Sequence, residues 1–88
     1  MKVAFRASFL RDLHAVKDQS VLRRIRDVIE NVEQADKPTE ISNLKKLKGQ
    51  GQYYRIRIGD HRIGLKIEAD TVNFVRALNR KEIYRYFP

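Results

Sequence analysis

Residues 53–67 read YYRIRIGDHRIGLKI, and their alternation of apolar and polar side chains predicts a β-hairpin. Gly59-Asp60 separates the two alternating runs and is a tight-turn signal. A turn centred on this dipeptide puts every apolar side chain on one face, for any loop with an even number of residues. The side chains of that predicted buried face are Tyr54, Ile56, Ile58, Ile63, Leu65 and Ile67.

The same register gathers basic side chains on the opposite face of the hairpin. Arginines that face each other across two strands repel, and a bound polyanion would relieve that repulsion. The alternative is a solvent-exposed face whose charges serve solubility. Because no acidic residue stands among the strand positions of this face before Glu68, we favour a binding face. The predicted pairs are Ile58 with His61, Arg57 with Arg62, Ile56 with Ile63, Arg55 with Gly64, and Tyr53 with Lys66.

Two uncharged residues fit a binding face. Gly64 lies between Arg62 and Lys66 and leaves space for a ligand to approach the backbone closely. Tyr53 shares the face and is suited to stack on a base of single-stranded RNA. We therefore expect this side of the hairpin to bind a nucleic acid.

A third strand follows over residues 71–78, after a turn at Ala69-Asp70. This turn pairs Leu65 with Phe74 and Arg62 with Ala77. Strict alternation would then place Arg80 on the helix-packed face. We expect the strand to end near Leu78 or Asn79, so that Arg80 and Lys81 turn towards the basic groove. Residues 81–88 are aromatic-rich and form either one helical turn or a docked tail.

The N-terminal half predicts one strand and two helices. Residues 2–6 alternate as a strand does, and Ser8 is a plausible N-cap for a short amphipathic helix. Residues 18–20 break the pattern and cap a second helix, which Lys37-Pro38 ends. The apolar stripe of the second helix is Val21, Leu22, Ile25, Val28, Ile29 and Val32.

The element order predicts an α+β fold in a single domain, residues 1–88. An N-terminal strand and two helices precede a three-strand antiparallel meander, and both helices pack on one sheet face. Residues 39–52 are expected to connect the halves as a loop or a short turn of helix. Their lysines are equally consistent with a flexible phosphate-binding flap beside Gly49 and Gly51 and with an ordinary exposed loop. These lysines are Lys45, Lys46 and Lys48.

Composition limits the classes of partner. The formal net charge of +8 and the pI of about 10.1 favour a nucleic acid or an acidic protein. The chain has no cysteine, its histidines are not spaced as metal ligands, and no glycine pattern matches a nucleotide-binding loop. We therefore expect no metal or cofactor. The N-terminus lacks a signal-peptide pattern and no run is long enough to span a membrane, so we expect a cytoplasmic protein.

Three segments together resemble the RelE/ParE toxin superfamily. They are Leu47-Lys48-Gly49, the run YRIRIGDHRI at residues 54–63, and the run NRKEIY at residues 79–84. The resemblance covers essentially the whole chain. It implies the toxin of a type II toxin–antitoxin system, bound and blocked by a cognate antitoxin, expected to be acidic, in a hetero-oligomer. RelE-like members of this family cleave mRNA in the ribosomal A site without a metal.

The resemblance also implies roles for individual residues. Arg55 and Arg57 correspond to strand residues that contact the RNA backbone. Arg62 and Arg80 correspond to arginines that stabilise the phosphoryl transition state, and Tyr84 to a tyrosine near the scissile bond. Many relatives have His where this chain has Asn79, which cannot titrate.

RNA cleavage by attack of a 2′-hydroxyl needs proton transfer as well as charge stabilisation. Arginines stay protonated and cannot act as bases. His14 is expected to be solvated, and His61 to be structural. Tyr84 is the best candidate acid, with lysines in support. Two other functions stay open: gyrase inhibition of the ParE type, and RNA binding without cleavage. The remaining candidate RNA-binding residues are Lys45, Lys46, Lys48, Tyr53, Lys66 and Lys81.

Overall fold

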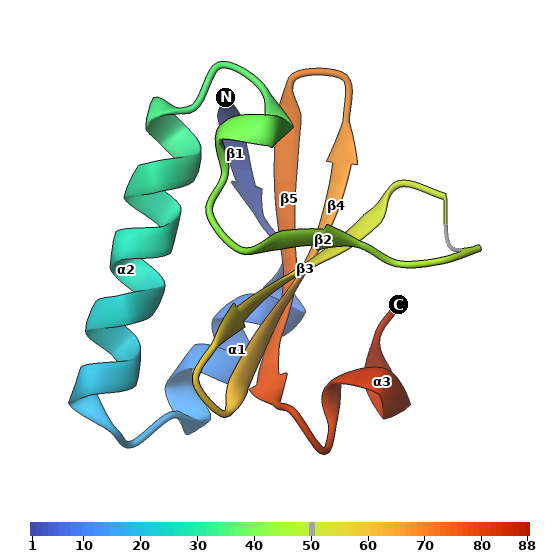
Figure 1. The fold of residues 1–88 in the computed structure, drawn as a ribbon. Coiled ribbons are helices and arrows are strands. Elements are labelled where there is room, and N and C mark those ends of the chain that lie inside the picture. The colour runs from blue at the N-terminus through green and yellow to red at the C-terminus, as the bar shows by residue number, and fades with distance from the viewer. Residues whose placement is uncertain (50) are drawn as a thin grey trace.

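A five-stranded sheet organises the chain, with strand order β1-β5-β4-β3-β2 (Figure 1). The computed structural model describes residues 1–49 and 51–88, and no helix within these residues is long and apolar enough to cross a membrane. The elements are β1 (Lys2–Phe5), α1 (Ala7–Ala15), α2 (Gln19–Gln34), the 3₁₀ helix η1 (Pro38–Glu40), β2 (Leu44–Lys46), β3 (Tyr53–Ile58), β4 (His61–Glu68), β5 (Thr71–Asn79) and α3 (Ile83–Tyr86).

The predicted meander forms the centre of this sheet. β3, β4 and β5 run antiparallel to one another, and the β3–β4 register matches the prediction at every pair from Tyr53–Lys66 to Ile58–His61. Gly59 has a φ of +54°, which an L side chain rarely adopts, so a glycine suits the turn. β1 extends the sheet by pairing in parallel with β5.

The connector contains a strand that the sequence analysis did not predict. Residues 44–46 form β2 and pair antiparallel with residues 54–56 of β3, so the expectation of a loop or helical turn is wrong for this part. A run this short carries no measurable periodicity. The exposed edge of β3 supplies unpaired backbone groups that such a segment can satisfy.

Because of a β-bulge in β5, the observed β4–β5 register differs from the predicted one. Leu65 pairs with Phe74 as predicted, but Arg62 pairs with Leu78 instead of Ala77. The register shifts between Gly64 and Leu65 because Val75 is an extra, unpaired residue on β5. The strand ends at Asn79, as expected.

Ser8 forms a hydrogen bond at this bulge and does not cap α1. The N-cap of α1 is Arg6, whose side chain makes no capping bond, so the predicted role of Ser8 is wrong. The Ser8 hydroxyl instead donates to the Val75 carbonyl at 2.6 Å. The second helix begins as predicted, because the Asp18 carboxylate accepts from the Ser20 amide at 2.8 Å. These bonds to Ser20 lower the pKa of Asp18.

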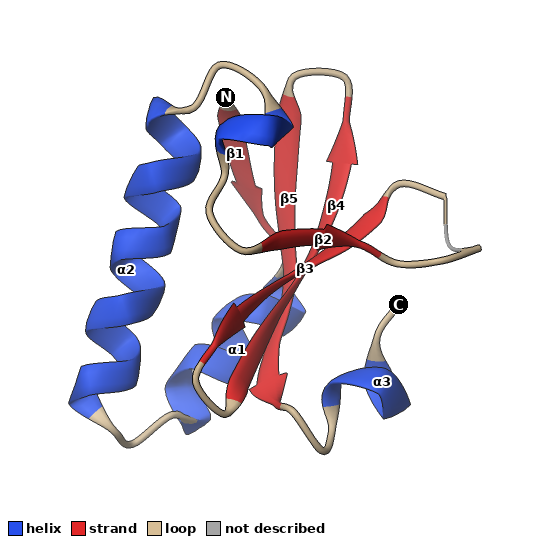
Figure 2. Cartoon of the chain, viewed as in Figure 1, coloured by secondary structure: helices blue, strands red, loops and turns tan. Residues whose placement is uncertain are grey.

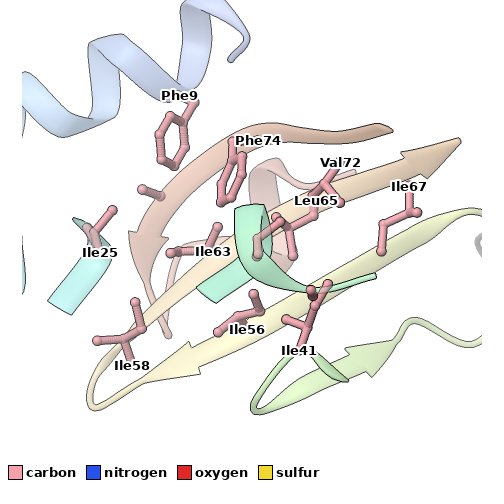
Figure 3. Close-up of a cluster of buried hydrophobic side chains, with 13 residues drawn as sticks. Phe9, Ile25, Ile41, Ile56, Ile58, Ile63, Leu65, Ile67, Val72 and Phe74 are labelled. Atoms are coloured by element: carbon pink, nitrogen blue, oxygen red, sulfur yellow. The ribbon is translucent and has the colours of Figure 1, made fainter. Parts of the chain in front are cut away.

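Both helices pack on the same sheet face, as predicted (Figure 2). Phe9 of α1 and Ile25 and Val32 of α2 are buried against the sheet. The other side chains of this core come mainly from the strands (Figure 3). They are Ala35, Ile41, Ile56, Ile58, Ile63, Leu65, Ile67, Val72, Phe74 and Ala77. The opposite face of the hairpin is thereby left for polar side chains.

A buried carboxylate fastens α1 to the second half of β5. Asp12 is only 8% exposed, and its Oδ2 accepts from the Arg76 Nε at 2.8 Å and from the Ala77 amide at 2.9 Å. Arg76 Nη2 donates to the other carboxylate oxygen at 3.1 Å. The hydrogen bonds to Asp12 raise the pKa of Arg76. The guanidinium also lies 5.7 Å from the centre of the Tyr86 ring of α3. Asp12 therefore connects α1, β5 and α3.

Replacing Asp12 with alanine should destabilise the fold. The change leaves the Ala77 amide and the Arg76 guanidinium without their acceptor, which costs about 2–3 kcal/mol for charge-assisted bonds. Glu30→Ala, on the exposed side of α2, is the control and should change the free energy of unfolding by less than about 0.5 kcal/mol. Urea denaturation measures both. Equal stabilities of the two variants would contradict this role of Asp12.

Candidate nucleic-acid interface

The face of the hairpin opposite the core is cationic. Arg57 pairs with Arg62, and Lys45 of β2 pairs with Arg55, so these side chains lie on the same side of the sheet. Lys46 pairs with Tyr54, which packs against the core, and therefore lies on the other side. The structure thus separates Lys46 from the other predicted RNA-binding residues of the sheet. We call Lys45, Arg55, Arg57 and Arg62 the cationic face.

Arg62 feels the charges of several other residues that were predicted to belong to the site. Burial lowers its pKa, and the guanidinium groups of Arg57 and Arg55 lower it further. Arg80 acts in the same direction, whereas Tyr84 opposes it. The fold therefore brings together Arg62 and four other predicted site residues from two strands and the C-terminal segment.

Arg62 is held in place by the β3–β4 turn. Its Nη1 donates to the Gly59 carbonyl at 2.7 Å and to the His61 carbonyl at 2.9 Å. In the described part of the chain, both side-chain hydrogen bonds of Arg62 use Nη1. Nε and Nη2 are left to donate to a ligand, and two such donors match the oxygens of a phosphate.

Arg80 reaches the same turn from the end of β5. Its backbone amide donates to the Asp60 carbonyl at 2.7 Å, and its Nε lies 3.8 Å from Asp60 Oδ1. Asn79 shapes the exit from the strand, because its side-chain oxygen accepts from the Lys81 amide at 2.9 Å and its carbonyl accepts from Glu82. The strand ends before Arg80 as expected, and the charge of Arg80 acts on Arg62, which agrees with a turn of Arg80 towards the basic groove. Lys81 is exposed in this connection.

An aromatic side chain fills the space predicted for a ligand at Gly64. A Cβ on Gly64 would lie 2.7 Å from the Phe87 ring, so glycine is needed for this contact. Phe87 is 3% exposed and meets the Tyr53 ring edge-on at 5.5 Å. The expectation of an open approach to the backbone at Gly64 is therefore wrong. The C-terminus is both one helical turn, α3, and a docked tail.

Phe87 separates two of the predicted binding residues on β4. Gly64 lies between Arg62 and Lys66 on β4, so the ring of Phe87 sits between their side chains. Lys66 lies 5.6 Å from the centre of the Tyr53 ring and 3.6 Å from Glu68 Oε1. Contacts within the protein thus engage Tyr53 and Lys66, whereas Arg57 and Arg62 lie on the other side of Phe87 and Arg55 lies level with it, opposite Gly64.

Tyr84 is exposed and shares a pocket with the connector. Lys48 and Leu47 line one part of this pocket, which has a volume of about 270 Å³. Tyr84, Phe87 and Pro88 line the rest. The pocket thus brings a lysine of the connector beside Tyr84, whose phenol also acts electrostatically on Arg62. Lys48 thus lies beside a predicted site residue, whereas Lys46 does not.

Over the residues that the structure describes, no contact joins the imidazole of either histidine to the arginines of this interface. His14 is exposed on α1, as expected. His61 is half-buried and pairs with Ile58 and Asn79 in the sheet. Within residues 1–49 and 51–88, no three His, Asp or Glu side chains gather as potential metal ligands.

The geometry suits a phosphodiester. Arginine side chains from β3 and from the segment after β5 act electrostatically on Arg62 of β4, as does the Tyr84 phenol, and a bound anion would relieve the repulsion among the arginines. The family model that describes the ParE toxin of type II toxin–antitoxin systems matches residues 3–84.

The chain belongs to the RelE/ParE family of toxins.

Similar proteins agree with this assignment. The chain is 42% identical to Toxin RelE3 of Methanocaldococcus jannaschii over the full length of both proteins. It is 32% identical to Putative toxin RelE1 of the same organism over 72% of this chain and 71% of that protein. In the RelB–RelE antitoxin–toxin complex from Methanococcus jannaschii, one chain superposes with a TM-score of 0.83 and 39% identity, covering 97% of this chain and 99% of that one.

The fold extends to a more distant member. A chain of the archaeal RelE–RelB complex from Pyrococcus horikoshii superposes with a TM-score of 0.73 at 21% identity. The match covers 93% of this toxin and 97% of that chain. The α+β architecture is thus shared with solved structures of RelE-like toxins.

Two residues near the site were absent from the predictions. Phe87 was part of an aromatic tail, but no pattern indicated that it would pack on Gly64. Asp60 was identified only as a turn residue, yet its carbonyl and carboxylate both face Arg80. An acidic residue inside a basic run is the signal that could have identified Asp60.

The repulsion between the paired arginines should be measurable as stability. Arg57→Gln removes one of two like charges that face each other and should raise the free energy of unfolding by about 0.5 kcal/mol at low salt. The gain should shrink as salt screens the pair. Arg11→Gln, an exposed arginine on α1, is the control for lower net charge. A gain no larger than that of the control would contradict this account.

Proposed function

We propose that this toxin is a ribosome-dependent endoribonuclease that cuts mRNA and so inhibits translation. The observation that carries the proposal is that Arg55, Arg57, Arg80 and Tyr84 all lie near enough to Arg62 for their charges to act on its guanidinium. Arginine forks bind phosphate oxygens and stabilise the charge that builds on them. The mRNA in the ribosomal A site is the proposed substrate.

The proposed reaction is an attack within the RNA chain. The 2′-oxygen bonds to the adjacent phosphorus, and the bond from phosphorus to the 5′-oxygen breaks. Arg62 and Arg80 stabilise the charge on the phosphoryl oxygens, while Arg55 and Arg57 hold the backbone. Tyr84 donates a proton to the leaving 5′-oxygen, and Lys48 adds positive charge beside it. The proton of the 2′-hydroxyl passes to a basic group at the site or to water.

We also propose that a cognate antitoxin binds this toxin in a hetero-oligomer. Relatives have been solved as RelB–RelE antitoxin–toxin complexes. A net charge of +8 favours an acidic partner. An antitoxin that covers the cationic face would relieve the repulsion between its arginines and stabilise the folded toxin by mass action.

The decisive experiment is cleavage of mRNA on programmed ribosomes by toxin freed of its antitoxin. Wild-type toxin should cut the message, with or without a chelator. Arg62→Ala should slow single-turnover cleavage about 100-fold, a typical effect of removing one donor to transition-state charge. Arg80→Ala should also slow it, and both changes should weaken binding less than they slow cleavage. Arg26→Ala, exposed on α2, is the control and should cut like wild type.

Other outcomes identify the rival functions. Inhibition of gyrase supercoiling without cleavage on ribosomes would show that the toxin acts as a gyrase inhibitor. Salt-sensitive RNA binding that leaves the message intact would show a binding module. Equal cleavage by wild type, Arg62→Ala and Arg80→Ala would contradict the residue roles while leaving the nuclease activity standing.

A further inference from the structure

The β3–β4 turn at Gly59 and Asp60, together with His61 at the start of β4, contacts both arginines to which the proposed function gives a transition-state role. Its Gly59 and His61 carbonyls accept from Arg62 Nη1, and its Asp60 carbonyl accepts from the Arg80 amide. A backbone carbonyl leaves the charge of a guanidinium intact. These contacts therefore orient the Arg62 guanidinium and fix the Arg80 backbone without neutralising either side chain.

Asp60 differs from the rest of the turn because it adds a full negative charge. Its carboxylate lies 3.8 Å from Arg80 Nε, and the side chains are 76% and 58% exposed respectively. Such an exposed pair contributes little to stability. It lies beside the arginine cluster, where it competes with a phosphate for Arg80. Its position is thus costly for binding a polyanion.

We propose that Asp60 is a positioning residue that holds Arg80 at the site before RNA arrives. The inference rests on the proposed function and adds a regulatory element to the same site. Arg80 has a long side chain that samples many rotamers when free. The ion pair restricts it to the side of the turn where Arg62 is anchored. A phosphate then displaces a weak carboxylate contact and meets an arginine that is already oriented.

If Asp60 has this role, its removal should strengthen RNA binding and slow cleavage. Asp60→Asn removes a negative charge from the site, so RNA binding should tighten about three- to tenfold at low salt. The logarithmic salt slope should steepen by up to about 0.7 as Arg80 becomes available to one more phosphate. Single-turnover cleavage at saturation should nevertheless slow about two- to fivefold, because Arg80 is no longer held in orientation. Asp60→Glu retains the charge and should restore part of the rate.

The chain offers a matched control at the opposite end of the sheet. Asp70 lies in the β4–β5 turn and forms an exposed ion pair of similar length, 3.7 Å, with Lys2. Asp70→Asn makes the same chemical and charge change away from the cationic face. It should leave the saturated cleavage rate unchanged and alter RNA binding less than twofold.

The measurements are binding of a short single-stranded RNA across a salt series and single-turnover cleavage on programmed ribosomes. Tighter binding with slower cleavage in Asp60→Asn, but not in Asp70→Asn, supports the inference. Parallel losses of binding, rate and melting temperature would overturn it in favour of a structural role. An unchanged rate in Asp60→Asn would overturn it while the nuclease function stands. Absence of cleavage by wild type would instead overturn the proposed function, and this inference with it.

Discussion

The register of the β3–β4 hairpin, which pairs Ile56 with Ile63 and Arg57 with Arg62, is the constraint on which the rest of the structure depends. The register that buries Ile56 and Ile63 on one face forces these arginines together on the other. Hydrophobic burial outweighs a repulsion of about 0.5 kcal/mol, because each buried isoleucine contributes roughly 1.5–3 kcal/mol. The cationic face is therefore a consequence of the core. The repulsion between its arginines is small compared with the free energy that the buried side chains contribute.

Local patterning predicted this part of the molecule because every residue in it follows one rule. A period of two residues, a turn dipeptide and a buried apolar face determine the register completely. The capping of α2 by Asp18 was equally local. By contrast, the three residues of β2 were too few to show a period, and pairing with the edge of β3 defines them as a strand.

Contacts between distant residues account for what the sequence did not reveal. No glycine or proline in β5 indicates a bulge at Val75. The Val75 carbonyl accepts a hydrogen bond from Ser8, which belongs to another element. Asp12 and Arg76 are 64 positions apart, and each alone resembles a solvated charge. The arginines of the hairpin were visible as a group, whereas the docking of Phe87 on Gly64 depends on where α3 directs the chain.

The bulge also divides β5 into two segments with separate duties. Residues before it pair with β1 and hold the N-terminal strand, while residues after it lead into the segment that carries Arg80. Shifting the register by one residue reverses which face each later side chain occupies. The two segments therefore obey different alternation rules, and mutations in one do not set the facing of the other. Substitutions after the bulge can therefore change the segment that leads to Arg80 without changing the pairing of the first segment with β1.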